Sequence, residues 1–390
     1  MAFTTCEIKS QVIKTMTELT EYINDEKNNI VYLPLEKFIE EQSIFMDDQF
    51  YGRGTNWVRF NVDGFDSFCN RFNIPASFLS KITEPGLVSN MLNDYQLNSD
   101  IKEQMVRHQL VVDNREKTVL GVVSNTYVKY YNQTLIENLE KIFPKILKSY
   151  EISESYVINT NLHLRILSSN IKSGFIVGRG GSGEDISRVG LQISNSLVGN
   201  SSVNVCFFIL RLLCANGLTF ESFRNKGKVV HSGREETFQV RMKKAISPLL
   251  SEIKTIPGLI QSLMEIPFQP ETIVRTGGAE IVYSIIALQQ SEAENRKKLK
   301  NKKDNEELIE FDKNIIANYP QKYAGNLSRQ VFNSIYRSNQ SLFDFVNVFT
   351  EYAQTKDLRR KVEIEKRTGD FVKWILQNKK KLINAGGLYE

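Results

Sequence analysis

The sequence YVINTNLHLRIL at residues 156–167 is followed by QISNSLV at 192–198 and by VNVCFFILRLL at 203–213. Apolar and polar side chains alternate over much of the first stretch, as is typical of strands in a sheet, and the other two stretches resume a β pattern. A glycine-rich segment separates the first stretch from the second. These stretches therefore predict a mainly antiparallel sheet in the middle third of the chain.

A hairpin and a run of helices extend this prediction on either side. Residues 105–112 and 118–123 carry β-branched side chains around a polar turn, which is the pattern of a β-hairpin. From Glu236 onward the apolar spacing becomes helical, with a break at Pro257. Strands followed by a run of helices indicate an α+β fold and not the alternation of a doubly wound parallel sheet.

The N-terminal part predicts a small lobe of mixed α/β structure. Cys6–Asn24 has apolar residues near helical spacing, so it predicts an amphipathic helix. A strand is expected at Ile30–Leu33, and short helices are expected between residues 65 and 97. Residues 1–110 contain 10 Lys and Arg against 16 Asp and Glu, so this lobe is acidic.

Three regions follow from these patterns. We expect an acidic N-terminal lobe at residues 1–104, an antiparallel sheet core at 105–232 and a helical, basic region at 233–390. The chain beyond residue 110 contains 40 basic against 29 acidic side chains, so the positive charge lies toward the C-terminus.

The composition places the protein among folded cytoplasmic chains. Hydrophobic residues make up 41% and charged residues 24%, which is close to the average for globular proteins. The longest apolar runs are too short to cross a membrane, and the first ten residues lack the pattern of a signal peptide. Four cysteines without C-x-x-C pairing, and three histidines, indicate a reducing compartment with no structural zinc. We expect no cofactor.

The segment Gly178–Gly183, GRGGSG, could expose backbone N–H groups to a phosphate. A P-loop would end in Gly-Lys-Ser/Thr and begin a helix, whereas Glu184 and Asp185 follow here and would repel an anion. We therefore expect a mobile loop between strands. The alternative is a loop that contacts a nucleic-acid backbone through Arg179 and Arg188.

The sequence contains no recognisable catalytic motif. His108 and His163 lie in strand patterns, and His231 lies beside a turn. No nucleophile elbow or paired metal-ligand spacing occurs, so an enzyme is the less favoured hypothesis. A carboxylate-metal nuclease needs no contiguous motif and stays open as an alternative. Its ligands would come from four residues of the acidic lobe: Asp47, Asp48, Asp63 and Asp66.

Basic and aromatic residues suggest a nucleic-acid interface. Tyr127, Lys129 and Tyr130 form a compact aromatic-basic strip, in which rings could stack on bases while Lys contacts phosphate. Arg211 interrupts an apolar strand, so it requires either the open face of a sheet or a buried partner. A basic cluster near the C-terminus includes Arg359, Arg360 and Lys361. A solvated helix face and a packed strand end are the alternative interpretations of these residues.

Several segments resemble a known family. They are VVDN at 111–114, LGVV at 120–123, Tyr127, Asn132, GLQISNSLVG at 190–199, RLLCANGL at 211–218 and LFDFVNVFTEY at 342–352. This combination resembles a domain of unknown function found in phages, prophages and plasmids. The resemblance implies a role in the DNA metabolism of mobile elements, but it implies no established activity.

Three functions remain open at this point. The favoured hypothesis is a non-catalytic phage-type protein that binds nucleic acid, with single-stranded DNA in replication or recombination as the favoured partner. The second is a host-takeover or scaffolding protein that acts through protein contacts. The third is the metal-dependent nuclease. The protein would act in the cytoplasm of a host bacterium, without a membrane partner, and could assemble as a homo-oligomer.

Overall fold

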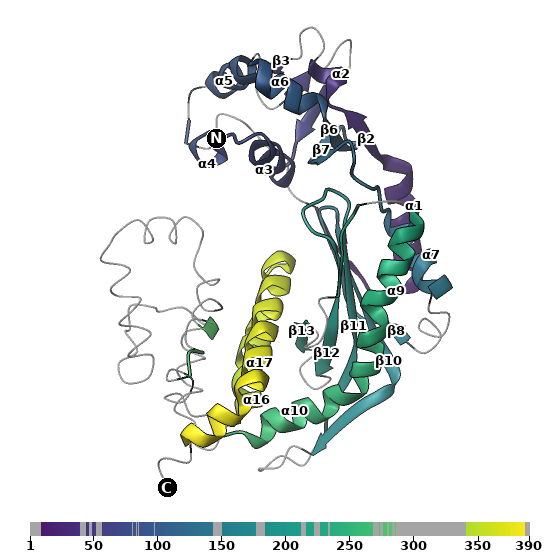
Figure 1. Ribbon diagram of the computed structural model, residues 1–390, viewed down its shortest axis with the longest axis vertical. Coiled ribbons are helices and arrows are strands. Elements are labelled where there is room, and N and C mark those ends of the chain that lie inside the picture. The colour runs from purple at the N-terminus through teal and green to yellow at the C-terminus, as the bar shows by residue number, and fades with distance from the viewer. Residues whose placement is uncertain are drawn as a thin grey trace, which may run out of the picture.

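Two sheets organise the chain (Figure 1). The computed structural model describes residues 9–39, 44–46, 49–51, 57–142, 150–176, 184–211, 216–221, 227–232, 235–267 and 341–386, except single positions at 80, 83, 85 and 97, together with a few residues between 273 and 285. The predicted α+β class is confirmed, because helices lie beside mostly antiparallel strands. Most of the predicted helical sequence between residues 272 and 337 lies outside the described residues.

The first sheet has six strands in the order β2-β6-β7-β5-β4-β3. Their bounds are β2 Ile30–Pro34, β3 Ile44–Met46, β4 Gln49–Tyr51, β5 Trp57–Phe60, β6 His108–Asp113 and β7 Thr118–Ser124. Neighbouring strands are antiparallel except β5 and β7, which run parallel. The predicted hairpin is present as β6 and β7, with Lys117 at a positive φ of 54° in its turn.

Helices accompany this sheet in the N-terminal lobe. They are α2 Glu36–Ile39, α3 Val62–Arg71, α4 Ala76–Leu79, α5 Leu87–Gln96 and α6 Ser99–Val106. Asn61 caps α3, because its side-chain oxygen accepts a hydrogen bond of 2.7 Å from the backbone N–H of Gly64. Phe68 of α3, Leu92 of α5 and Phe60 of β5 are buried in one hydrophobic cluster, so these elements share a core.

The strand pairing corrects the division predicted at residues 104 and 105. Val111 and Val112 of β6 pair with Tyr32 and Val31 of β2, so a boundary at 104 would separate hydrogen-bonded neighbours of one sheet. The β pattern of the hairpin could be seen in the sequence, but its partner strand 80 residues earlier could not. The lobe built on the first sheet therefore extends through Ser124.

The second sheet is larger and has eight strands. Six follow one another in the order β1-β9-β10-β11-β12-β13, while β8 pairs with β10 and β14 pairs with β12. Their bounds are β1 Ser10–Ile13, β8 Tyr150–Ile152, β9 Ser155–Ile158, β10 Asn161–Ile176, β11 Glu184–Ser196, β12 Val203–Arg211, β13 Asn216–Phe220 and β14 Lys228–Val229. Every pairing is antiparallel, as the sequence predicts for the middle third.

The stretch 156–167 forms two strands and not one. β9 and β10 make a tight hairpin in which Asn161 pairs with Ile158. Asn159 has a positive φ of 56°, a conformation that asparagine tolerates better than most residues. Apolar and polar side chains alternate on both sides of this turn. The sequence pattern therefore did not reveal that one strand ends and another begins here.

The amphipathic helix expected at Cys6–Asn24 also needs correction. Ser10–Ile13 forms β1, which pairs with β9 at the edge of the second sheet, and the helix α1 runs from Met16 to Asn29. Thr15 begins α1 with a capping box, in which its side chain and that of Glu18 each accept a hydrogen bond from the other's backbone. The helical prediction began too early because Val12 and Ile13 also suit a helix.

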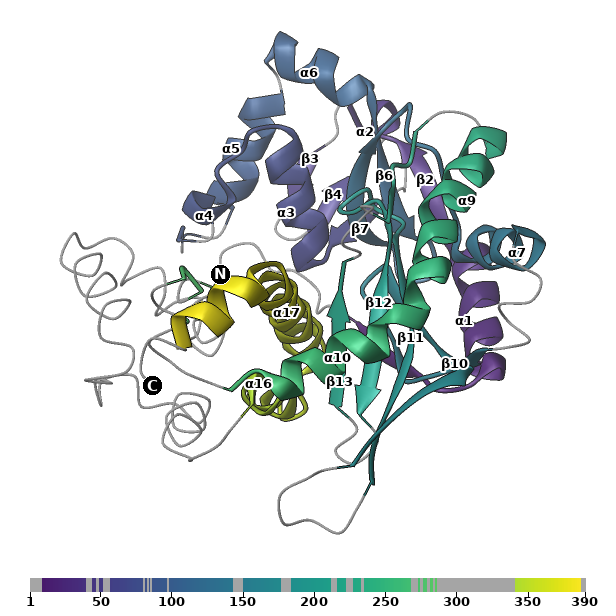
Figure 2. The ribbon, with the colours of Figure 1, turned by 60° about the horizontal axis from the view of Figure 1, so that its bottom comes forward.

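Helices cover both faces of the second sheet (Figure 2). Besides α1 they are α7 Asn132–Ile142, α9 Glu235–Glu252, α10 Ile256–Glu265, α16 Leu342–Ala353 and α17 Leu358–Gly386. A 3-10 turn at Ile253–Thr255 separates α9 from α10, near the predicted break at Pro257. In Figure 1 the green helix α9 and the yellow helix α17 lie on opposite sides of the strands.

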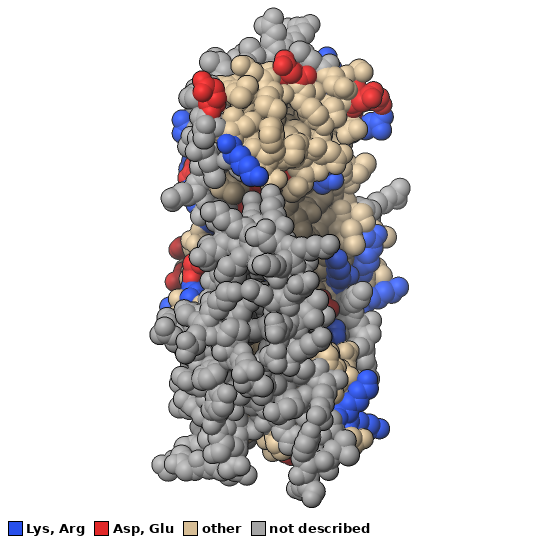
Figure 3. All heavy atoms as spheres, turned by 90° about the vertical axis from the view of Figure 1, so that its left-hand side faces the viewer, with Lys and Arg blue, Asp and Glu red and all other residues tan. Residues whose placement is uncertain are grey.

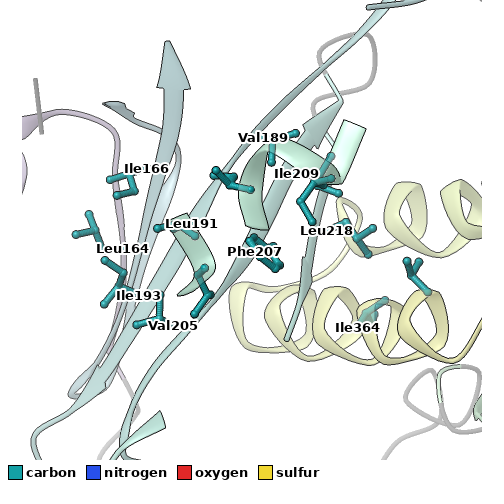
Figure 4. Close-up of a cluster of buried hydrophobic side chains, with 14 of the residues drawn as sticks. Leu164, Ile166, Val189, Leu191, Ile193, Val205, Phe207, Ile209, Leu218 and Ile364 are labelled. Carbon is teal, nitrogen blue, oxygen red and sulfur yellow. The ribbon is translucent and has the colours of Figure 1, made fainter. Parts of the chain in front are cut away.

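One face of this sheet is apolar. Because side chains alternate along a strand, residues of equal parity share a face. The apolar face is shown in Figure 4 and includes Leu164, Ile166, Val189, Leu191, Ile193, Val205, Phe207 and Ile209. Phe238 and Met242 of α9 are buried in the same cluster, so α9 covers this face.

The other face is polar, yet it is also covered. Arg165 of β10 lies beside Gln192 of β11 in the strand register, and its side chain is 2% exposed. The guanidinium forms an ion pair with the fully buried carboxylate of Glu365, which comes from α17. Its Nε also donates to Gln192 Oε1 at 2.7 Å, and its Nη1 donates to the Tyr156 hydroxyl at 3.1 Å.

Burial and pairing set the charges of this ion pair. Burial alone would lower the pKa of Arg165, but the neighbouring Glu365 carboxylate, together with Tyr156 and Cys206, raises it above its usual value. Burial raises the pKa of Glu365, and the guanidinium opposes the rise. A Cβ atom on Gly217 of β13 would lie 2.9 Å from Glu365 Oε1 and 3.3 Å from Arg165 Nη1. Glycine at this position therefore makes room for the pair.

Replacement of Glu365 tests whether this pair holds α17 on the sheet. The change Glu365→Ala leaves the Arg165 guanidinium buried without its counter-charge, so we expect the free energy of unfolding to fall by about 3–5 kcal/mol. Urea denaturation followed by circular dichroism measures this change.

The matched control is Glu363→Ala on the same helix. Glu363 pairs with Arg367 at 2.9 Å in a half-exposed position. Surface pairs contribute little, so we expect a loss of less than about 1 kcal/mol. Equal losses in the two variants would contradict the special role of the buried pair.

Candidate functional site

The aromatic-basic strip divides between the protein interior and its surface. Tyr130 is 1% exposed, and its ring stacks on Phe238 of α9. It belongs to the core, which corrects the prediction that it stacks on a base. The strip lies between β7 and α7, and Phe238 of α9 covers Tyr130 there.

Tyr127 and Lys129 lie nearer the surface. The Tyr127 hydroxyl donates to the Ser196 carbonyl oxygen at 2.8 Å and lies 3.1 Å from His231 Nδ1. Its half-buried ring stacks on the His231 ring, with the centroids 5.2 Å apart. Lys129 is exposed, and its Nζ lies 4.6 Å from the centroid of the Tyr32 ring. A nucleic-acid contact by either residue stays a prediction.

The arginines of the predicted sheet-side interface have different surroundings. Arg188 is largely buried in β11, and its guanidinium contacts Glu151 Oε2 at 2.9 Å. Arg211 is the last residue of β12, where its backbone pairs with Ser187 and Asn216. Arg179 and the whole segment Gly178–Gly183 lie outside the described residues.

The three predicted helical contacts occupy the first turn of α17. Lys361 is 8% exposed, with its Nζ 2.8 Å from Glu154 Oε1 and 5.0 Å from the centroid of the Tyr156 ring. Because it lies on the same helix face as Glu365, it belongs to the buried polar layer, which corrects its prediction as a phosphate contact. Arg359 is exposed and lies 3.6 Å from Asp63, whereas Arg360 is half-exposed.

The exposed side of α17 carries a row of basic residues. Arg359, Lys366, Lys373 and Lys380 follow one another at intervals of seven residues, which places them on one face of the helix. Neighbours in the row are about 10 Å apart along the axis, so the row extends over roughly 30 Å. Arg359, Lys366 and Lys380 are exposed, and Lys373 is half-buried beside Glu221 at 3.5 Å. This row forms the candidate site of the protein and is called the basic row below.

A second polar cluster joins α1, α7 and the second sheet. The backbone N–H of Asn132 donates to Glu26 Oε1 at 2.9 Å, and the Asn132 amide donates to the other Glu26 oxygen. Asn195 of β11 donates to Asn132 Oδ1 at 2.8 Å. Asn132 and Asn195 are both fully buried. The sequence did not single out Glu26, which is 4% exposed.

Burial raises the pKa of the Glu26 carboxyl from 4.5 to about 7, although the hydrogen bonds from Asn132 and Tyr22 act to lower it. Burial also lowers the pKa of His163 and of His231 to about 4, so both imidazoles are neutral near pH 7. Glu26 is therefore the buried group in this cluster whose charge changes near neutral pH.

The described part of the chain contains no group of three His, Cys, Asp or Glu residues that could hold a metal ion. Among the carboxylates of the nuclease hypothesis, Asp63 lies near Arg359 and accepts a hydrogen bond from Asn159 at 3.3 Å. Asp47 and Asp48 lie outside the described residues. None of the described helices is both long and apolar enough to cross a membrane.

Comparison with known proteins identifies a family without an assigned function. Residues 119–371, which are more than half of the chain, match the family described as a domain of unknown function, DUF932. No curated protein and no solved structure matches the chain. The matched range includes the Asn132–Asn195 contact and the Arg165–Glu365 pair, whereas Glu26 precedes it.

The titration of Glu26 predicts a pH-dependent difference in stability. Because its pKa is higher in the folded state, Glu26 contributes stability below about pH 4.5 that is lost as the pH rises through about 7. Glu26→Gln has no such titration. Between about pH 5 and pH 8 we expect the difference in unfolding free energy to shift toward the variant by about 2.5 kcal/mol.

Urea unfolding at several pH values measures this shift. Glu21→Gln is the matched control, because Glu21 is exposed on the same helix. The titrations of His163 and His231 are common to all three proteins and cancel in the differences. A pH-independent difference for Glu26→Gln would contradict the raised pKa of Glu26.

Proposed function

We propose that this chain, which belongs to the DUF932 family, binds nucleic acid through the basic row of α17 without catalysing a reaction on it. The observation that carries the proposal is the placement of four cations on one face of a long helix. The helix contains nine Lys and Arg against three Asp and Glu, so it has a large positive excess. Positive charge arranged along a line matches the phosphates of a nucleic-acid backbone.

The buried side of α17 makes this face rigid. Phe371, Ile375 and Leu382 anchor the helix in the hydrophobic core, and Glu365 anchors it to Arg165. The basic row therefore lies on a fixed support rather than on a loop. Figure 3 shows Lys and Arg side chains gathered along one edge of the molecule, while several acidic side chains lie on the N-terminal lobe at the top.

The carboxylates near the row do not oppose binding strongly. Asp63 lies 3.6 Å from Arg359 and Glu221 lies 3.5 Å from Lys373, and both pairs are partly exposed. Such pairs contribute little free energy, so a phosphate can replace the carboxylate as the partner of the cation. Single-stranded DNA is the favoured ligand. A flexible single strand can adapt its backbone to a straight row of charges, whereas a duplex is too stiff to do so.

The proposed setting is the cytoplasm of a bacterium that carries a phage, prophage or plasmid, where the protein acts in replication or recombination. This setting rests on the resemblance of the sequence to proteins of such elements. Assembly into a homo-oligomer would place several basic rows along one strand, which would strengthen binding through multivalency.

A triple substitution in the basic row tests this function. Lys366, Lys373 and Lys380 changed together to Ala remove three cations from one face of α17. We expect the logarithmic dependence of the binding constant on salt to flatten by up to about 2 for single-stranded DNA. Fluorescence anisotropy with single- and double-stranded oligonucleotides at several salt concentrations measures this slope.

The matched control removes the same charge from another helix surface. Lys243 and Lys244 of α9 and Lys254 of the following turn are exposed, so the triple Ala variant at these positions should fold and keep the slope. An equal effect of both triple variants would indicate a general effect of net charge. If the unmodified protein bound no oligonucleotide at low salt, the row would be a solvated face, and a scaffolding function would become the better hypothesis.

A further inference from the structure

A cleft of about 840 Å³ lies where the two sheets meet. Its lining comes from β1, α1, β5 and the turn between β6 and β7. Residues from the β9–β10 turn contribute to the lining as well. Cavities of this size between structural layers commonly hold small molecules.

Thr160 lies in the lining of this cleft with an unused hydrogen-bonding group. The residue is 2% exposed, and its Oγ1 has no hydrogen-bond partner in the described part of the protein. A buried hydroxyl without a partner is unfavourable, so most such groups in folded proteins are satisfied. A polar group of a bound molecule would supply the partner.

Trp57 gives the cleft an aromatic surface. It belongs to β5, lines the cleft and keeps 37% of its surface exposed. The guanidinium carbon of Arg59 lies 5.7 Å from the centroid of the Trp57 ring. An exposed indole stacks readily on another planar ring.

The charges that line the cleft leave no positive excess. Three cations and four carboxylates line it: Lys9, Arg59, Arg115, Asp25, Glu26, Asp113 and Glu116. Lys9 pairs with Glu116, and Arg115 pairs with Asp25 at 3.1 Å. No positive excess is left for a polyphosphate, so the lining suits a ligand without net charge.

We infer that this cleft binds a nucleoside, with its base against Trp57 and a hydroxyl or ring nitrogen hydrogen-bonded to Thr160 Oγ1. A nucleoside combines a planar face, polar edges and no charge, which are the three properties that the lining selects. This site is lined by residues other than those of the basic row, and the inference does not depend on the proposed function. The nucleic-acid backbone binds at α17, whereas the cleft takes an uncharged monomer.

Tryptophan fluorescence tests the inference on the full chain. The protein has two tryptophans, so the variant Trp374→Phe leaves Trp57 as the single reporter. Adenosine, cytidine and thymidine are titrated in turn, with maltose as an uncharged polyol without an aromatic ring. We expect saturable quenching by at least one nucleoside and none by maltose.

Paired substitutions locate the contact. Thr160→Val removes the hydroxyl and should weaken nucleoside binding about tenfold, whereas Thr160→Ser keeps the hydroxyl and should bind nearly as the unmodified protein does. Trp57→Ala, measured by calorimetry, should weaken binding at least about tenfold. Thermal unfolding of each variant confirms that the fold is retained.

Three results would overturn the inference. They are the absence of nucleoside binding at millimolar concentration, equal binding of maltose, and unchanged affinity in a folded Thr160→Val variant. Oligonucleotide binding is measured separately on the same preparations. Loss of nucleoside binding with unchanged oligonucleotide binding would therefore distinguish a failure of this inference from a failure of the proposed function.

Discussion

An arginine in the middle of a β-sheet must be neutralised before the sheet can be covered. Arg165 meets this requirement with Glu365, while Gln192 and Tyr156 accept further hydrogen bonds from its guanidinium. The rings of Tyr156 and Phe208 lie 4.5 and 4.6 Å from its guanidinium carbon, so its flat faces are also occupied. An uncompensated charge here would exclude α17 from the sheet.

The covered polar face explains why this sheet does not offer the open surface typical of single-strand binders. His163, Arg165 and Gln192 all point toward α17, and Lys361 extends the same layer to Glu154 at its edge. In the proposed function, the outer side of α17 provides the binding surface in place of this sheet face. One helix therefore carries a buried acidic group on one side and the basic row on the other.

Much of the fold could be predicted from alternation and helical spacing, but the long-range pairings could not. The sequence did not single out Arg165, because the residue that pairs with it lies 200 residues away. The basic neighbours of Tyr130 in the sequence suggested that its ring is exposed. Its stacking on Phe238 shows that the ring belongs to the core. Lys361 carried a readable signal, because it lies one helical turn before Glu365 and shares the face of buried Thr368 and Val372. Glu26 gave no signal, since it lies in a helix rich in charged residues.

The distance in sequence between Arg165 and Glu365 also bears on synthesis. The strands of the second sheet leave the ribosome long before α17, because Glu365 follows Arg165 by 200 residues. Until α17 is made, the Glu365 carboxylate cannot neutralise the guanidinium of Arg165. The strands next to Arg165 also lack the helix that covers them in the native structure. High contact order of this kind slows folding and prolongs the life of partly folded chains. The emergence of α17, rather than the formation of individual hairpins, is then the event after which this face of the sheet can be covered.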